Sequence, residues 1–194
     1  MFPRITSLAF QGPGKVPFMI SWRKYVDTFD EDGITLNAEA HDIRFSYLQP
    51  DEVLLARDLL NRQIVPVRKD EEAFFHVGSD ALLIYIQRLR TADGQPIFLE
   101  NLFLPYEPYK NLMSENLNDV SMFDAIERIS GLRPATAGRQ RIEAVRATAE
   151  QAQLLNLSLG EPLLYLNAYF HDQYDHPLCI GRQYYIGSRY MFEF

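Results

Sequence analysis

The sequence predicts an α+β fold built around an antiparallel sheet, and a duplicated pattern carries that prediction. Residues 82–97 contain an apolar strand, a polar turn and a proline, and residues 163–178 repeat this order 81 positions later, so that Pro96 corresponds to Pro177. Each copy is typical of a β-hairpin. Short helical segments alternate with strands, and hairpins stand in place of βαβ crossovers, which indicates α+β rather than α/β.

Each hairpin also follows a segment that we expect to be a short helix. Ala56 and Leu59 in the first copy are matched in spacing by Ala152 and Leu155 in the second. The first copy is longer between helix and hairpin, and we expect residues 61–78 to form an inserted hairpin there. A duplicated helix–hairpin unit closes into one pseudo-symmetric domain, and the crevice between its halves is a natural ligand site.

Composition limits the class of protein. The 194 residues, 47% of them hydrophobic, suit one domain with a sizeable core. A net charge of −7 makes this chain by itself a poor match for nucleic acid. The single cysteine, Cys179, excludes an internal disulfide and fits a reducing compartment. Since no apolar run approaches the roughly 20 residues of a spanning helix, we expect a soluble, cytoplasmic protein without membrane contact.

The N-terminal third is expected to begin with an arm. Residues 11–17 hold two glycines and two prolines, so we assign residues 1–20 to an arm or linker and residues 21–194 to the domain. Residues 34–47 alternate apolar and polar side chains, which predicts extended chain that pairs with the later hairpins. Pro50, followed by two acidic residues, is typical of a helix start.

Two further helices have start and stop signals. Ser121 with Asp124 predicts a helix start, and Gly131 its end. Thr148 with Gln151 repeats the start signal, and Gly160 is the expected stop. The stretch between the two helices, residues 138–147, is expected to be a strand.

Arg88 and Arg90 are the first candidate binding residues. They are two apart on a predicted strand, so their side chains share one sheet face. Two guanidiniums there repel each other unless an anion lies between them, and each charge-assisted hydrogen bond is worth about 1.5 to 3 kcal/mol. Pairing with local carboxylates, or exposure to water, explains them equally well. Glu100, on the returning strand, either accepts hydrogen bonds from a ligand or is the cross-strand counter-ion.

Weaker candidates come from a helix start and from the second repeat. Ser121 offers a hydroxyl beside backbone N–H groups that favour anions, or it only caps the helix. Phe123 is a ligand platform or a core residue. With an offset of 81, Tyr169 and His171 are the repeat partners of Arg88 and Arg90, which makes them candidate pocket residues, although a histidine beside Asp172 also fits a surface turn.

Motifs of known enzyme classes are not found in the sequence. The histidines share no metal-ligand spacing, and there is no phosphate loop, nucleophile elbow or informative Cys/His pair. We therefore expect no metal and no cofactor, and an enzyme built on a recognisable motif is disfavoured.

Several ordered segments together resemble one family. Residues 88–100 (RLRTADGQPIFLE), Leu104-Pro105 and Ser121–Asp124 are similar to the signature of the UbiC transcription-regulator-associated (UTRA) domain. The C-terminal part follows the same family order at residues 142–144, 149–150, 157–164, 175–178 and 187–192. The resemblance covers residues 21–194.

The resemblance implies a chorismate-lyase-like fold that serves as the effector-binding and dimerising part of a GntR-type, HutC-subfamily bacterial transcription regulator. It implies a homodimer that senses a small anionic metabolite, such as a phosphorylated sugar or a carboxylate. Operator DNA would be bound only through a winged-helix domain, which this chain lacks. In the family's pattern the anion is held by Arg88, Arg90 and Ser121. Glu100 would recognise polar groups of the effector, and Phe123 and Tyr185 would wall the pocket.

Two features besides the missing winged-helix domain depart from the family, and two other functions stay open. Residues 61–78 are longer than the family's usual connection, and Cys179 stands where many sugar-phosphate sensors have an acidic residue. One alternative is a chorismate-lyase-like enzyme with Glu100 as acid or base, since one fold can host both functions. The other is a structural dimerisation domain without a ligand. The interpretation preferred here is a binding domain, not an enzyme.

Overall fold

The computed structural model describes the backbone of residues 8–11, 17–21, 25–30, 33–39, 44–47, 55–92, 94–187 and 190–192, and side chains within 56–91, 94–135 and 138–187. The described strands form two antiparallel sheets. The larger has eight strands in the order β3-β4-β9-β10-β11-β8-β7-β6, and the smaller has four in the order β12-β1-β2-β5. The strands are β1 (Leu8–Gln11), β2 (Pro17–Ser21), β3 (Tyr25–Asp30), β4 (Gly33–Glu39), β5 (Arg44–Tyr47), β6 (Leu55–Pro66), β7 (Leu82–Ala92), β8 (Gln95–Pro105), β9 (Pro134–Arg146), β10 (Pro162–Asp172), β11 (Pro177–Ile186) and β12 (Tyr190–Phe192).

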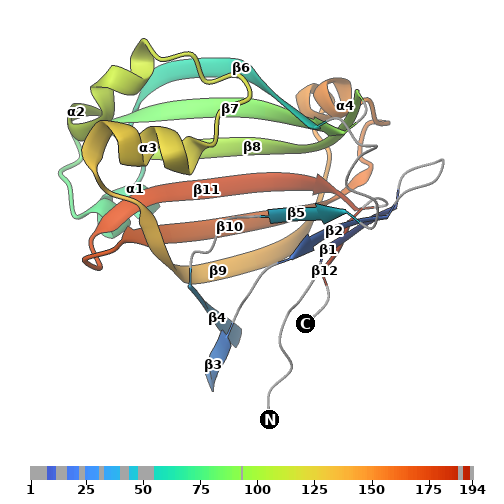
Figure 1. The fold of residues 1–194 in the computed structure, drawn as a ribbon, viewed down its shortest axis with the longest axis horizontal. Helices are drawn as coiled ribbons and strands as arrows, with labels where there is room; N and C mark the ends of the chain where they lie inside the picture. Colours follow the sequence, from blue (N-terminus) through green and yellow to red (C-terminus); the bar gives the residue numbers. More distant parts are fainter. Residues whose placement is uncertain are drawn as a thin grey trace.

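The strands from β9 to β6 in the large sheet form two equivalent halves. Half one is β6, α1 (Lys69–Phe75), β7 and β8, and half two is β9, α4 (Ala149–Leu155), β10 and β11. The two halves are joined in the sheet by the pairing of β8 with β11, the last strand of each half (Figure 1). Both hairpins have a register irregularity at the same place, after Arg90 in half one and after Phe170 in half two. The α+β fold class and the duplicated hairpins are therefore confirmed.

The registers fix the offset between the halves. Arg88 pairs with Glu100 in half one, and Ala168 pairs with Gly181 in half two. Equivalent positions are therefore 80 residues apart from β6 and β9 through the first hairpin strands, β7 and β10. In the returning strands, β8 and β11, they are 81 residues apart. The equivalence of Pro96 and Pro177 holds, but an offset of 81 is wrong for β7 and β10.

The helix expected before the first hairpin is wrong in the part that the structure describes. Ala56 and Leu59 lie in β6, a strand that pairs with β7 along its whole length. Residues 50–54 lie outside the described residues. The segment 61–78 is not an inserted hairpin either, because it contains the end of β6 and helix α1, which is the true equivalent of α4. A cross-strand ladder outweighs the weak local helix signals here, since strand preference depends on the neighbours that a segment packs against.

Local start signals for the other two helices are confirmed. α3 (Met122–Ser130) begins at Ser121, whose Oγ accepts a hydrogen bond from the Asp124 N–H at 3.3 Å, and ends at Gly131 with φ 71°. α4 begins at Thr148 with the expected reciprocal capping by Gln151. Its end is at Asn156, in the left-handed conformation, and not at Gly160.

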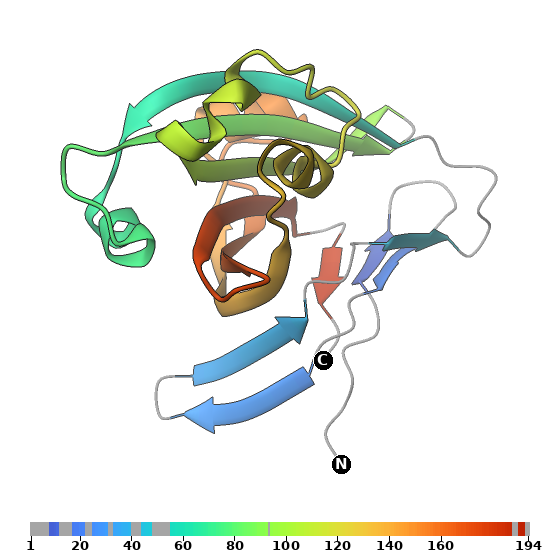
Figure 2. The same cartoon turned by 60° about the vertical axis from the view of Figure 1, so that its left-hand side comes forward.

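The segments before residue 55 pair with two different partners. β4 continues the large sheet by pairing with β9, whereas β5 pairs with β2 in the small sheet. Of the described residues between 34 and 47, the first part thus joins the repeated halves and the last part does not. Figure 2 shows the β3–β4 hairpin extending away from the rest of the large sheet. The strand expected at 138–147 is confirmed as β9. The boundary between arm and domain at residue 20 stays a prediction.

Helices pack on both faces of the large sheet. The short helix α2 (Tyr106–Tyr109), a 3₁₀ turn (Lys110–Met113) and α3 lie on one face, called the α3 face, and pack on Ile84, Ile86 and Phe170. α1 and α4 lie on the opposite face, where they cover two separate apolar clusters. In Figure 1 α3 lies in front of the sheet. Among the helices of the described part of the chain, none has the length and apolar character needed to cross a membrane.

Candidate functional site

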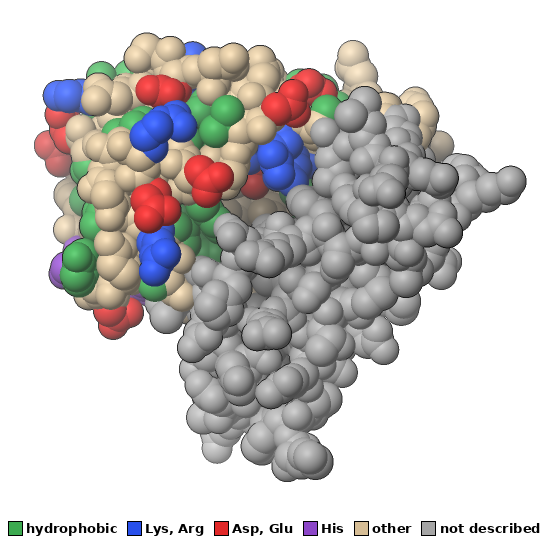
Figure 3. Space-filling model, viewed as in Figure 1, with side chains coloured by type: hydrophobic (Ala, Val, Ile, Leu, Met, Phe, Trp, Pro, Cys, Tyr) green, Lys and Arg blue, Asp and Glu red, His purple; other side chains and the backbone are tan. Residues whose placement is uncertain are grey.

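Polar side chains gather on the α3 face next to the apolar core. Cross-strand registers arrange them in two neighbouring rows that run across β6, β7, β8 and β11. The first row is Arg57, Arg90, Phe98 and Tyr185; the second is Leu59, Arg88, Glu100 and Gln183. Figure 3 shows acidic and basic side chains next to one another on this side of the molecule. Three arginines and one glutamate thus meet on one patch of the sheet.

Arg88 is the most buried member of this patch. It is 1% exposed, and its Nε donates a hydrogen bond to Glu100 Oε2 at 2.8 Å. Nη2 donates to the same oxygen, and Nη1 donates to the carbonyl of Val120, just before α3. Arg88 therefore holds Glu100 on one side and the start of α3 on the other. Of the two interpretations that the sequence left open for Glu100, the ion pair with Arg88 bears out the cross-strand counter-ion.

Arg90 shares the same carboxylate at longer range. Its Nη1 lies 3.9 Å from Glu100 Oε2, and its guanidinium lies over the Phe98 ring, 5.3 Å from the centroid. Burial lowers the pKa of Arg90, and the negative charge of Glu100 opposes this effect. The positive charges of Arg57 and Arg88 lower the pKa of Arg90 further. Arg90 is only 7% exposed, so its charge is kept away from water.

Glu100 is held in its ionised form. Burial alone would raise the pKa of this carboxyl group, but the charges of Arg88 and Arg90 and the hydrogen bonds from Arg88 outweigh burial and keep the pKa below its ordinary value. At neutral pH the group is therefore a hydrogen-bond acceptor.

Tyr185, Ser121 and Phe123 border the patch in different ways. The Tyr185 ring packs against Phe98 at 4.6 Å between centroids, and its hydroxyl donates to Gln183 Oε1. Burial raises the pKa of Tyr185, which is thus a neutral hydrogen-bonding group. Ser121 is half-buried, caps α3 and follows the carbonyl that Arg88 holds. Phe123 packs on Phe170, 5.3 Å between centroids, in the core beneath α3.

Tyr169 and His171 lie on the opposite face of the sheet. With the true offset of 80, the partners of Arg88 and Arg90 are Ala168 and Phe170, and a shift of one residue turns a side chain to the other face. Both residues instead line a separate groove of about 380 Å³ between α1, β9 and β10, where Phe74 packs edge-on against each of them. The structure therefore separates this pair from the arginine site.

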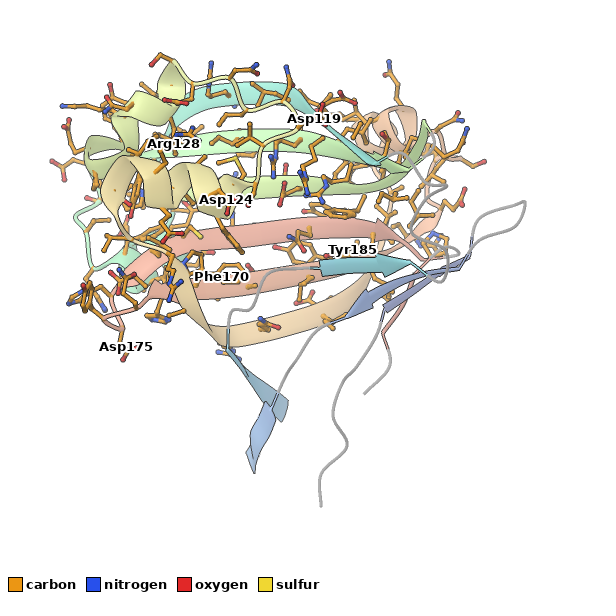
Figure 4. All side chains as sticks on the ribbon, in the orientation of Figure 1. Asp119, Asp124, Arg128, Phe170, Asp175 and Tyr185 are labelled. Carbon is orange, nitrogen blue, oxygen red and sulfur yellow. The ribbon has the colours of Figure 1, made fainter. Side chains whose placement is uncertain are left out.

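Arg57 and Gln183 belong to the patch but were not expected there. Arg57 was overlooked because residue 57 fell in the expected helix, whereas the strand β6 places it directly opposite Arg90. Gln183 lies beside Glu100 across β8 and β11, a pairing between the halves that no local signal reveals. In Figure 4 Tyr185 and Asp119, a neighbour of Arg57, lie at one end of the sheet, and Phe170 lies toward the other.

The chemistry of the patch is that of an anion-binding site. Guanidinium groups supply planar, permanently charged donors that match phosphate and carboxylate oxygens. Within the part of the chain that the structure describes, no group of three or more His, Cys, Asp or Glu side chains is placed to hold a metal ion.

Solved structures of regulator domains share this fold. The chain matches the ligand-binding domain of a protein from Bordetella bronchiseptica assigned to the GntR family of transcriptional regulators, with a TM-score of 0.66 and 17% identity over 81% of this chain and 94% of that one. It also matches the effector domain of PhnF from Mycobacterium smegmatis, with a TM-score of 0.65 and 23% identity over 70% of this chain and 82% of that one. The fold is thus that of the ligand-binding domains of GntR-family regulators.

Sequence comparison gives the family itself. The model of the UTRA domain matches residues 55–191, well over half of the chain, so the chain belongs to the UTRA domain family. The HTH-type transcriptional repressor NagR of Bacillus subtilis (strain 168) is 26% identical over 134 residues, which are 69% of this chain and 54% of NagR. The chain spans about half the length of that relative. The family resemblance and the fold predicted from sequence are confirmed.

Proposed function

We propose that this chain is the effector-binding domain of a GntR-family transcription regulator of the HutC type. Arg88, Arg90 and Glu100 would bind a small anionic metabolite, such as a sugar phosphate or a carboxylate. The observation that supports this most is a pair of nearly buried guanidiniums on one sheet face. Glu100 pairs with Arg88 and lies 3.9 Å from Arg90, and an anion that reaches these donors in a largely buried site gains further charge-assisted hydrogen bonds.

The remaining residues of the patch have matching roles in this proposal. Glu100, kept ionised by Arg88, accepts hydrogen bonds from hydroxyl or amine groups of the effector. Tyr185 forms an aromatic wall, and Ser121 presents its hydroxyl at the start of α3. Phe123, which packs on Phe170 beneath α3, would wall the site from the side of that helix. A carboxyl group with a lowered pKa is a poor proton donor, which favours a binding domain over a chorismate-lyase-like enzyme.

Relatives support the regulatory setting. NagR is named as a transcriptional repressor, and the matched part of PhnF is named as its effector domain. By analogy, the domain proposed here forms a cytoplasmic homodimer and reaches operator DNA through a winged-helix domain. An effector that prefers one arrangement of the protomers by about 1 to 3 kcal/mol is enough for a useful switch.

A thermal-shift screen tests the proposal. The chain is heated with sugar phosphates, phosphonates and small carboxylates, beside Arg90→Gln and the control Arg128→Gln, which changes an exposed arginine paired with Glu115 on the outer side of α3. A ligand of the native state raises the unfolding midpoint. We expect one class of anion to raise the midpoint of the wild type and of Arg128→Gln, but not of Arg90→Gln. An equal rise in all three proteins would contradict the proposed site, and light scattering on the same samples checks the dimer.

A further inference from the structure

Arg57 is a third guanidinium on the α3 face, and the sequence analysis did not single it out as a binding residue. It lies on β6 directly opposite Arg90 in the antiparallel ladder, so the two side chains leave the same face about 4.5 to 5.5 Å apart at Cβ. Like charges in directly opposed positions destabilise a sheet. The fold therefore carries an unfavourable pair at this position.

The guanidinium of Arg57 has a donor that is not used within the described structure. Its Nη1 donates to the Asp119 carbonyl at 3.2 Å, but its Nε is buried and has no hydrogen-bond partner. Among the described residues, no carboxylate lies within ion-pairing distance of this group. A buried donor without a partner costs about 1 to 3 kcal/mol, and a ligand oxygen would remove that cost.

Arg57 acts on the same site electrostatically as well as by position. Burial is the main cause of the lowered pKa of Arg90, and the charge of Arg57 lowers it further. The same charge adds to the effect of Arg88 and Arg90 in lowering the pKa of Glu100. An anion bound between Arg88 and Arg90 is therefore within the field of Arg57.

The backbone around Arg57 is fixed in advance. Its N–H donates to Asp119 Oδ1 at 2.8 Å, and the Asp119 N–H donates back to the Arg57 carbonyl at 3.0 Å. The next outward N–H of β6, from Leu59, donates to Asn118 Oδ1 at 2.8 Å. These bonds hold the strand edge against the loop that leads to α3. A preorganised cation of this kind binds without a large ordering cost.

We propose that Arg57 contacts the effector and selects a phosphoryl or phosphonyl group over a carboxylate. This inference rests on the proposed function of the site. Arg88 and Arg90 approach the anion along one strand, and Arg57 approaches it from the neighbouring strand. A carboxylate has two oxygens in one plane, whereas a phosphate monoester has three terminal oxygens and a charge of about −1.5 to −2 at neutral pH. Only the second geometry gives each of three guanidiniums an oxygen.

Two small ligands with similar polar arms test the selection. Glycerol 3-phosphate and glycerate are titrated by calorimetry into the wild type, Arg57→Gln, Arg57→Lys and Arg90→Gln. Arg62→Gln is the matched control, since Arg62 is also on β6 but donates to the carbonyls of Leu112 and Glu115. We expect the wild type and Arg62→Gln to bind the phosphate at least about tenfold more tightly than glycerate. Arg57→Gln should lose most of that preference, and Arg57→Lys should regain part of it.

Each other outcome overturns a defined claim. If Arg57→Gln keeps the wild-type preference while Arg90→Gln loses binding, the role of Arg57 is refuted and the proposed site stands. If neither variant alters binding, or if the wild type binds neither ligand at millimolar concentration, both the role of Arg57 and an anion site of this kind are refuted. Circular dichroism of every variant confirms that it is folded before titration.

Discussion

The two halves of the large sheet share a backbone plan but carry opposite chemistry on the α3 face. Arg57, Arg88, Arg90 and Glu100 of half one correspond, through the registers, to Ala137, Ala168, Phe170 and Gly181 of half two. Half two fills its face with apolar packing, where Phe123 meets Phe170 beneath α3. The duplicated architecture therefore sets the fold, and the differences between equivalent positions set the site.

The largest effect is expected from breaking the charge pair of half one. Arg88→Ala leaves Glu100 largely buried with only Arg90 nearby, at 3.9 Å, and should lower the free energy of unfolding by about 3 to 5 kcal/mol. The double variant Arg88→Ala/Glu100→Ala imitates the uncharged face of half two and should cost less than the sum of the single changes. Urea unfolding measures both values, and additive costs would mean that the two side chains are not coupled.

A smaller effect is expected from the helix that follows the first strand of each half, α1 in half one and α4 in half two. Glu71 of α1 is 0% exposed, and its carboxylate accepts hydrogen bonds from Arg182 Nη1 at 2.8 Å and from the Arg68 N–H at 2.9 Å. Its equivalent in α4, Gln151, is partly exposed and only caps its own helix. Glu71→Ala should cost about 2 to 3 kcal/mol, since Arg182 keeps its bond to Asp70.

The matched change in half two, Gln151→Ala, should cost about 1 kcal/mol or less, the usual contribution of a cap. Chemical denaturation of both variants measures the difference. Equal losses would show that the bond between Glu71 and Arg182, which joins the two halves, adds nothing beyond capping.

The mildest effect is confined to acid solution. The pKa of Glu100 is lowered in the folded chain by Arg88 and Arg90, against the effect of burial, and the pKa of Asp172 in half two is lowered by the N–H groups of His176 and Tyr174, again against burial. A lowered pKa adds stability above the unfolded value, roughly 4, and this stability is lost as the pH falls through the folded value.

Glu100→Gln and Asp172→Asn should each flatten the fall in unfolding free energy as the pH is lowered from about 6 to 3. Guanidinium unfolding at several pH values measures the slopes. An unchanged slope in Glu100→Gln would mean that the carboxylate of half one is not stabilised by its arginines.

Local signals in the sequence predicted much of half two and of the hairpins. Ser121 and Thr148 cap their helices as expected, because capping depends on residues three positions apart. The hairpins and the shared face of Arg88 and Arg90 follow from alternation along one strand. The helix expected at Ala56 failed because its signals were weak and β6 is stabilised by pairing with β7.

The candidate site was predicted in part for the same reason. Arg88, Arg90, Glu100 and Tyr185 were found through their motif, and the structure brings them together. His171 was misplaced because the offset between the halves changes from 80 to 81 along the hairpin, and an error of one position reverses the face.

The features that could be predicted from the sequence have causes that lie within a few residues: the hairpins, the caps of α3 and α4, and the family signature around Arg88. The sequence did not reveal that residues 55–66 form a strand, that Arg57 faces Arg90, or that the four charged side chains of the patch, Arg57, Arg88, Arg90 and Glu100, all come from half one; these features depend on the tertiary structure. Strand register and face depend on pairing between segments far apart in the chain. That pairing is set by the packing of the whole sheet and is invisible to any short window of sequence.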